Sequence, residues 1–234
     1  MEHFLEQVSE VSGLPLPMVF ALTAALMSGV GVGLVLVRRD LAIKLSDFTT
    51  FLGGLILCGL AVFHLLPEAI ETGRWLVLTG GVLFGLGLHF IAHQINQKPN
   101  QDVSTHYASA GIALLAIGLH SFLDGMVYAV TLDHDHVGGA FTGLGLILHE
   151  TPEGILALMI SLLIFKRSEL ALLVTLVLAT FSTPVGTLTS LWVSETIGVS
   201  FYENAFPFSA GLIAAAGANL VYSGFQGIRK ILTT

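Results

Sequence analysis

The chain has 234 residues, of which 54% are hydrophobic and only 11% are charged, and its formal net charge is −7. Soluble domains carry about 25% charged residues, so this composition excludes an ordinary soluble domain and predicts a polytopic membrane protein. The single cysteine, Cys58, excludes an intramolecular disulfide and a cysteine metal cluster.

Apolar runs of about 20 residues, the length at which a helix spans a bilayer, recur along the whole chain. The polar connections between them are short, which predicts one all-α transmembrane domain over residues 1–234, a helical bundle of about seven spans. The candidate spans are residues 16–37, 48–67, 75–94, 107–132, 139–165, 169–193 and 205–228.

The basic residues between these spans indicate an orientation. If the loops alternate between the two faces, one face receives all of them except Arg74, namely Arg38, Arg39, Lys44, Lys98, Lys166, Arg167, Arg229 and Lys230. The positive-inside rule then places the N-terminus outside and the C-terminus in the cytoplasm. We therefore expect an integral protein of the cell membrane (plasma or inner membrane). Its expected surroundings are the lipid bilayer, and no nucleic-acid partner is expected.

Two apolar runs contain the same arrangement of polar residues. His120 precedes Asp124 by four residues, His149 precedes Glu153 by four, and a glycine follows each acid directly. Residues four apart share one face of a helix, and the connection between these two spans is short, so the helices are expected to be antiparallel neighbours. Ionisable groups inside a membrane cost about 2.5–3.5 kcal/mol each on insertion scales and usually mark a function. The alternative is a buried polar network that only holds two helices together.

Two imidazoles and two carboxylates form a suitable ligand set for a divalent transition metal. Glu150 and Ser121 lie beside the histidines, about 100° round each helix. They could complete a second subsite bridged by Asp124 and Glu153, or orient the histidines from outside the site. The predicted metal ligands are His120, Asp124, His149, Glu150 and Glu153, with Ser121 as a possible member of the second subsite. Pro152 removes one backbone hydrogen bond within the second motif, as in the broken helices with which transporters bind ions.

Other histidines lie nearer the ends of the spans. His64 and Glu68 repeat the four-residue spacing near the outer boundary, where a pathway role and an interfacial cap are both open. His89, His93 and His106 fall near the inner boundary and could pass metal to the cytoplasm. On the outside, the segment 133–136 alternates aspartate and histidine and could gather cations or simply be solvated.

These motifs resemble the ZIP family (Zrt/Irt-like proteins) of divalent metal transporters. The resemblance rests on residues 64–69 (HLLPEA), 120–125 (HSFLDG) and 149–154 (HETPEG), with a weaker echo in residues 182–186 (STPVG). It implies a helical bundle with the metal site between the fourth and fifth spans, an N-terminus outside, and import by alternating access. It also implies bridging positions for Asp124 and Glu153. The family usually has eight spans, and a bundle that is one span short favours a homodimer.

The resemblance and the residues together predict a transporter of divalent cations, zinc first, with iron, manganese, cobalt and cadmium as alternatives. No organic cofactor and no enzymatic activity are expected, and no phosphate-binding loop GxxxxGK[ST] indicates ATP coupling. Because carboxylates and imidazoles must lose protons to bind metal, uptake should weaken at acid pH. The main alternative is a zinc-dependent intramembrane hydrolase, although Glu153 stands where the protease motif HExxH needs histidine. A metal sensor is a third reading.

Overall fold

The computed structural model describes residues 2–96, 103–165, 167–197 and 199–233, and within them it contains helices and no strand. Six helical segments are both long enough and apolar enough to cross a membrane. This arrangement confirms an all-α polytopic bundle. In a bilayer no water is present to satisfy the backbone. A single apolar segment therefore crosses as a helix, because a helix makes all of its backbone hydrogen bonds within itself.

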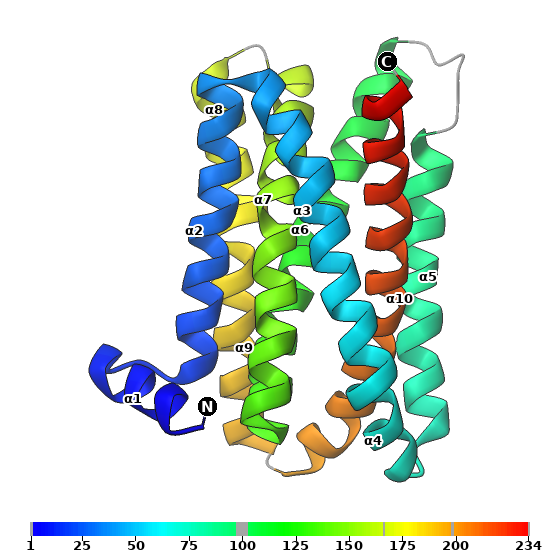
Figure 1. The fold of residues 1–234 in the computed structure, drawn as a ribbon. Helices are drawn as coiled ribbons and strands as arrows, with labels where there is room; N and C mark the ends of the chain where they lie inside the picture. Colours follow the sequence, from blue (N-terminus) through cyan, green and yellow to red (C-terminus); the bar gives the residue numbers. More distant parts are fainter. Residues whose placement is uncertain (1, 97–102, 166, 198, 234) are drawn as a thin grey trace.

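The helices follow the predicted spans closely. The bundle contains α2 (Leu16–Val37), α3 (Arg39–Leu60) extended by the π-helical turn η1 (Ala61–Leu65) and α4 (Leu66–Glu71), α5 (Trp75–Asn96), α6 (Val103–His134), α7 (His136–Ile164), α8 (Ser168–Thr175) extended by the π-helical turn η2 (Leu176–Thr180) and α9 (Ser182–Ile197), and α10 (Val199–Thr233). The predicted span 75–94 corresponds to α5, whose apolar part, Trp75–Gly87, is shorter than in the other six. The two labelled chain ends lie at opposite ends of the bundle (Figure 1), and the predicted seventh crossing, by α5, stays a prediction.

Three local features differ from the sequence-based prediction. Residues 38–47 were expected to form a loop, but α3 begins at Arg39 and its charged first turns continue the membrane-length helix. The predicted connection 133–138 contracts to Asp135, because the Asp135 carboxylate accepts hydrogen bonds from the Val137 and Gly138 amides and so caps α7. The helix α1 (Glu2–Ser12) was not predicted.

The surface of the bundle is apolar along its length. Leu26, Phe63 and Leu76 expose 67%, 85% and 90% of their surface, among many large hydrophobic side chains. Exposed apolar surface of this extent is costly in water and natural against lipid tails. The exposed side chains therefore agree with a membrane-spanning bundle.

The helices pack in two groups. Helix α10 packs along α3 and α5, and these helices with η1 and α4 form the support group. Helices α2, α6, α7, α8 and α9, with η2, pack on one another and form the site group. The groups meet mainly where α3 lies against α7, and Gly53 of α3 sits beside the backbone of Gly145 and His149 there. Figure 1 shows α3 (cyan) crossing in front of α7 (green).

Candidate metal site

The two sequence motifs meet near the middle of α6 and α7. His120, Asp124, His149 and Glu153, here called the inner cluster, each offer one ligand atom, and these atoms all lie within 4.8 Å of one another. Atoms bound to one zinc ion at about 2.0–2.2 Å lie at most about 4.4 Å apart. Small side-chain rotations would therefore bring the four residues to one metal ion.

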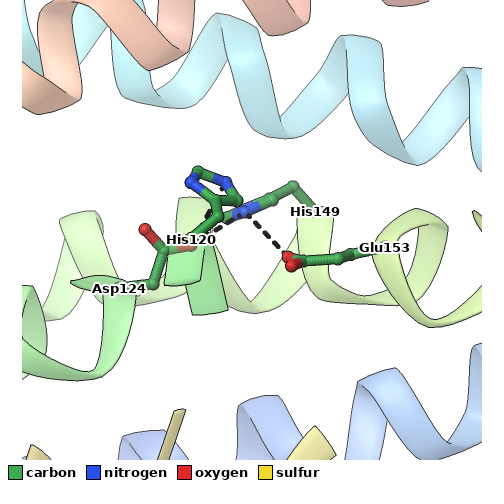
Figure 2. Close-up of side chains that lie close together, drawn as sticks. All are labelled: His120, Asp124, His149 and Glu153. Atoms are coloured by element: carbon green, nitrogen blue, oxygen red, sulfur yellow. Dashed lines mark ion pairs between the residues drawn. The ribbon is translucent and has the colours of Figure 1, made fainter. Parts of the chain in front are cut away.

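Individual distances show how closely the side chains approach across the two helices. His149 Nε2 lies 3.0 Å from Asp124 Oδ2 and 3.7 Å from Glu153 Oε2, while His120 Nε2 lies 3.6 Å from Asp124 Oδ2. The two imidazole rings have centroids 5.4 Å apart. Figure 2 shows the four side chains converging between the two helices, with His149 nearest the centre.

The short connection predicted that α6 and α7 are antiparallel neighbours, and the structure confirms this pairing.

The inner cluster is buried, and several of its polar atoms have no hydrogen-bond partner. Asp124, His149 and Glu153 expose 4%, 3% and 7% of their surface, while His120 is partly exposed. Asp124 Oδ2, Glu153 Oε2 and both ring nitrogens of His149 are buried without a hydrogen bond within the part of the chain that is described. Such atoms are costly to leave unsatisfied. A metal cation would give the two carboxylate oxygens and one of the His149 nitrogens a partner at the same time.

Ser121 lies beside the inner cluster and contacts one of its acids. The Ser121 hydroxyl is completely buried and lies 2.7 Å from Glu153 Oε1, to which it donates a hydrogen bond across the two helices. This contact leaves Glu153 Oε2 facing His149. Of the two roles left open by the sequence, the geometry favours orientation of a ligand over direct coordination by Ser121.

Glu150 is not among the four gathered residues, although the sequence grouped it with them. Its side chain is completely buried, and Glu150 Oε1 accepts a hydrogen bond of 2.9 Å from the Thr183 hydroxyl on α9. Its second oxygen, Oε2, has no hydrogen-bond partner among the described residues. Direct coordination by Glu150 stays a prediction. Through this hydrogen bond between Thr183 and Glu150, the 182–186 segment contacts the motif on α7.

The glycines that follow the two acids allow neighbouring helices to approach the site. A Cβ atom on Gly125 would collide with the Thr183 carbonyl of α9, and a Cβ atom on Gly154 would collide with the Ser28 carbonyl of α2. Likewise, Gly186 of α9 lies directly against the Phe122 carbonyl. The small residues thus place α2 and α9 against the backs of the helices that carry the ligands.

His64 and Glu68 lie at the end of the bundle that holds α4, away from the inner cluster. There His64 approaches Asp135, and Glu68 approaches His134, in the turn between α6 and α7. We call these four residues the end cluster. Their pathway role stays a prediction. The sequence treated His64 with Glu68 and the segment 133–136 as separate features, and only the packing of the two helix groups brings them together.

Two further points concern residues around the site. The side chains of His89, His93 and His106 lie outside the described residues, so their predicted inner role is unaddressed. Tyr128, one helical turn beyond Asp124, is completely buried with an unpartnered hydroxyl and packs against Phe20. Sequence reasoning missed Tyr128, although its spacing of four residues from Asp124 was the available signal.

Chemically, the inner cluster offers two imidazole nitrogens and two carboxylate oxygens. Two carboxylates balance the charge of a divalent cation, so the loaded site would carry little net charge into the low-dielectric interior. Imidazole with carboxylate suits zinc and its neighbours better than magnesium or calcium. Comparison with protein-family models and with curated protein sequences found no match.

Proposed function

We propose that this protein carries divalent transition-metal cations across a membrane towards the cytoplasm, with zinc as the first candidate. Iron, manganese, cobalt and cadmium remain alternative cargoes, since the same ligand types accept them. One observation carries the proposal: four ligand atoms within 4.8 Å of one another lie midway along two adjacent helices of membrane-spanning length. A metal held at that depth has left the water on both sides.

The inner cluster lies within the site group, on helices that include α7, which packs against the support group, and this position supports transport over a static metal site. The backbone of His149 lies beside Gly53, where α7 packs against α3, so one ligand-bearing helix of the site group contacts the support group at the level of the cluster. A displacement of one group relative to the other would change the side from which the cluster is reached, as alternating access requires. The family assignment to ZIP proteins, based on the motifs, belongs to the same proposal.

The experiment is uptake of radioactive zinc into proteoliposomes that contain the native protein, Asp124→Ala or Glu153→Ala. We expect saturable uptake by the native protein and none above background for either variant, because each change removes a buried ligand. Glu169→Ala is the matched control, since Glu169 is an exposed acid at the start of α8. It should leave uptake unchanged. Competition by the other metals would then rank selectivity.

The same experiment separates transport from the hydrolase hypothesis. Zinc that binds stoichiometrically to the native protein but never enters the vesicles would contradict the transporter proposal. The inner cluster would then have to be tested as a centre for metal-activated water. A zinc hydrolase keeps one coordination position open for water, whereas the inner cluster already supplies four protein ligands, which favours transport.

A further inference from the structure

The end cluster joins the two helix groups through histidine–carboxylate contacts. His64 and Glu68 belong to η1 and α4 of the support group, and His134 and Asp135 belong to the α6–α7 turn of the site group. Each pair therefore spans the boundary between the groups. All four side chains are partly exposed, by 31% to 42%, so ions in the surrounding water can reach them.

The ligand atoms form a continuous chain. Asp135 Oδ2 lies 2.8 Å from His64 Nε2, which lies 3.9 Å from Glu68 Oε2, and Glu68 Oε1 lies 2.9 Å from His134 Nε2. The His134 ring also stacks on Phe206 of α10, with ring centroids 3.6 Å apart. This contact fixes the direction in which its Nε2 points.

Three observations distinguish this cluster from a pair of ordinary surface contacts. Glu68 Oε2 is inaccessible to solvent and has no hydrogen-bond partner among the described residues, although it faces His64. His64 sits in the π-helical turn η1, an irregularity that occurs often at functional sites. A Cβ atom at Gly138 would collide with His64 Nε2, so glycine at this position leaves room for the imidazole.

We propose that the end cluster is a second divalent-metal site, which binds a zinc-like cation between the two helix groups. The ion would be bound by these imidazole nitrogens and carboxylate oxygens, and it would give Glu68 Oε2 the partner it lacks. Because its ligands come from both groups, a bound ion ties the groups together at this end of the bundle. The site does not depend on transport by the inner cluster.

Metal counting on the purified full-length protein in detergent tests this site. In Asp124→Ala/Glu153→Ala, which lacks the inner ligands, equilibrium dialysis against Zn²⁺ should still find one bound ion per chain. Adding His64→Ala or Glu68→Gln should weaken that binding at least 10-fold, while adding His136→Ala should not. His136 is the control because it is an exposed histidine of the same turn outside the cluster.

A second readout tests whether the ion ties the groups together. Hydrogen exchange of Leu66–Glu71 and of the α6–α7 turn should slow when Zn²⁺ is added to the double variant, and this slowing should disappear with Glu68→Gln. Glu68→Gln keeps the size of the side chain, so it decides the matter if His64→Ala fails to fold. If the double variant itself fails to fold, the native protein is used, and Glu68→Gln should lower its zinc count by one. A folded protein whose zinc count is unaffected by His64→Ala and Glu68→Gln would overturn the proposal, and so would loss of zinc with His136→Ala.

Discussion

The inner cluster and the end cluster use the same residue types, and both contain a histidine four residues before an acid. They differ in their surroundings. Asp124, His149 and Glu153 expose 3% to 7% of their surface and leave ligand atoms unpartnered. The end-cluster side chains are 31% to 42% exposed and already lie in ion-pair contact with one another. Histidine–carboxylate contacts occur in both clusters, but water further reduces the electrostatic cost at the end of the bundle, whereas the buried inner cluster lacks that help and gains more from a cation. Burial, more than spacing, should therefore decide which site binds metal tightly.

The largest expected difference concerns one aspartate from each cluster. Asp124→Asn removes a buried charge that a bound ion needs, so it should weaken the tighter zinc-binding step by more than about 100-fold, since changes outside the ligand shell alone cost about 10–100-fold. Asp135→Asn should leave that step unchanged. Zinc titration of both variants by calorimetry measures the difference. Equal losses from the two substitutions would show that the tight site is not the inner cluster.

A smaller effect is expected from the serine that orients Glu153. Ser121→Ala removes the hydroxyl that lies 2.7 Å from Glu153 Oε1, and zinc affinity should fall by about 10–100-fold without loss of the bound-ion count. Ser190→Ala is the matched control, because Ser190 is equally buried and its hydroxyl has no partner among the described residues. If Ser190→Ala lowers zinc affinity as much as Ser121→Ala does, Ser121 has no specific orienting role.

The close approach of α9 to α6 can be tested with two glycines of the same helix. Gly125→Ala places a Cβ atom against the Thr183 carbonyl, whereas Gly111→Ala points into open space. Overpacking costs about 1–3 kcal/mol, so Gly125→Ala should lower the melting temperature in detergent and also weaken zinc binding. Gly111→Ala should be neutral or slightly stabilising. An unchanged melting temperature in Gly125→Ala would mean that the two helices do not approach this closely.

The smallest predicted effect is a pH dependence at the end cluster. Burial alone would raise the pKa of the Asp135 carboxyl, but hydrogen bonds from the Gly138 amide, His64 and the Val137 amide outweigh it and lower that pKa. The ionised carboxyl therefore stabilises the folded state above the ordinary aspartate pKa of about 4. This contribution is lost as the pH falls through the lowered value.

Melting temperatures measured in chelator would check this sign. The native protein should melt above Asp135→Asn at pH 7, and the gap should narrow as the pH falls below about 4. Asp133→Asn, at an exposed position of α6 just before the turn, controls for the loss of a negative charge there. A gap that widens on acidification would contradict the lowered pKa.

Periodicity and spacing were sufficient to locate the membrane-length helices, though not all of their ends, and the core of the candidate site. Four-residue spacing places His120 with Asp124 and His149 with Glu153, and the short connection makes α6 and α7 neighbours, so the convergence of these four residues follows from local rules. Helix α1 was missed because it is too short and too polar to read as a span. Its signal was the pair Leu5 and Val8, which pack against the bundle near Leu16 and Leu132.

The rest of the site depended on tertiary packing. The contact between Glu150 and Thr183 requires the position of α9 relative to α7, and no periodicity in either helix specifies that position. The same holds for the end cluster, in which His64 pairs with Asp135 and Glu68 with His134, each across more than 60 residues of sequence, through the packing of the two helix groups. Sequence reasoning therefore located each His–acid pair separately without showing that His64 and Asp135 belong together.

The glycine that follows each acid gives the motif a second role, in helix packing. In HSFLDG and HETPEG the first and fifth residues are the metal-ligand candidates. The sixth residue, glycine, lets the backbone of a neighbouring helix pack directly beside the ligand. An engineer who grafted only the two histidines and two acids onto another helical bundle would copy the ligands without their support. Transplanting this site would require six letters from each helix, together with the small-residue surfaces of α2 and α9 that receive them.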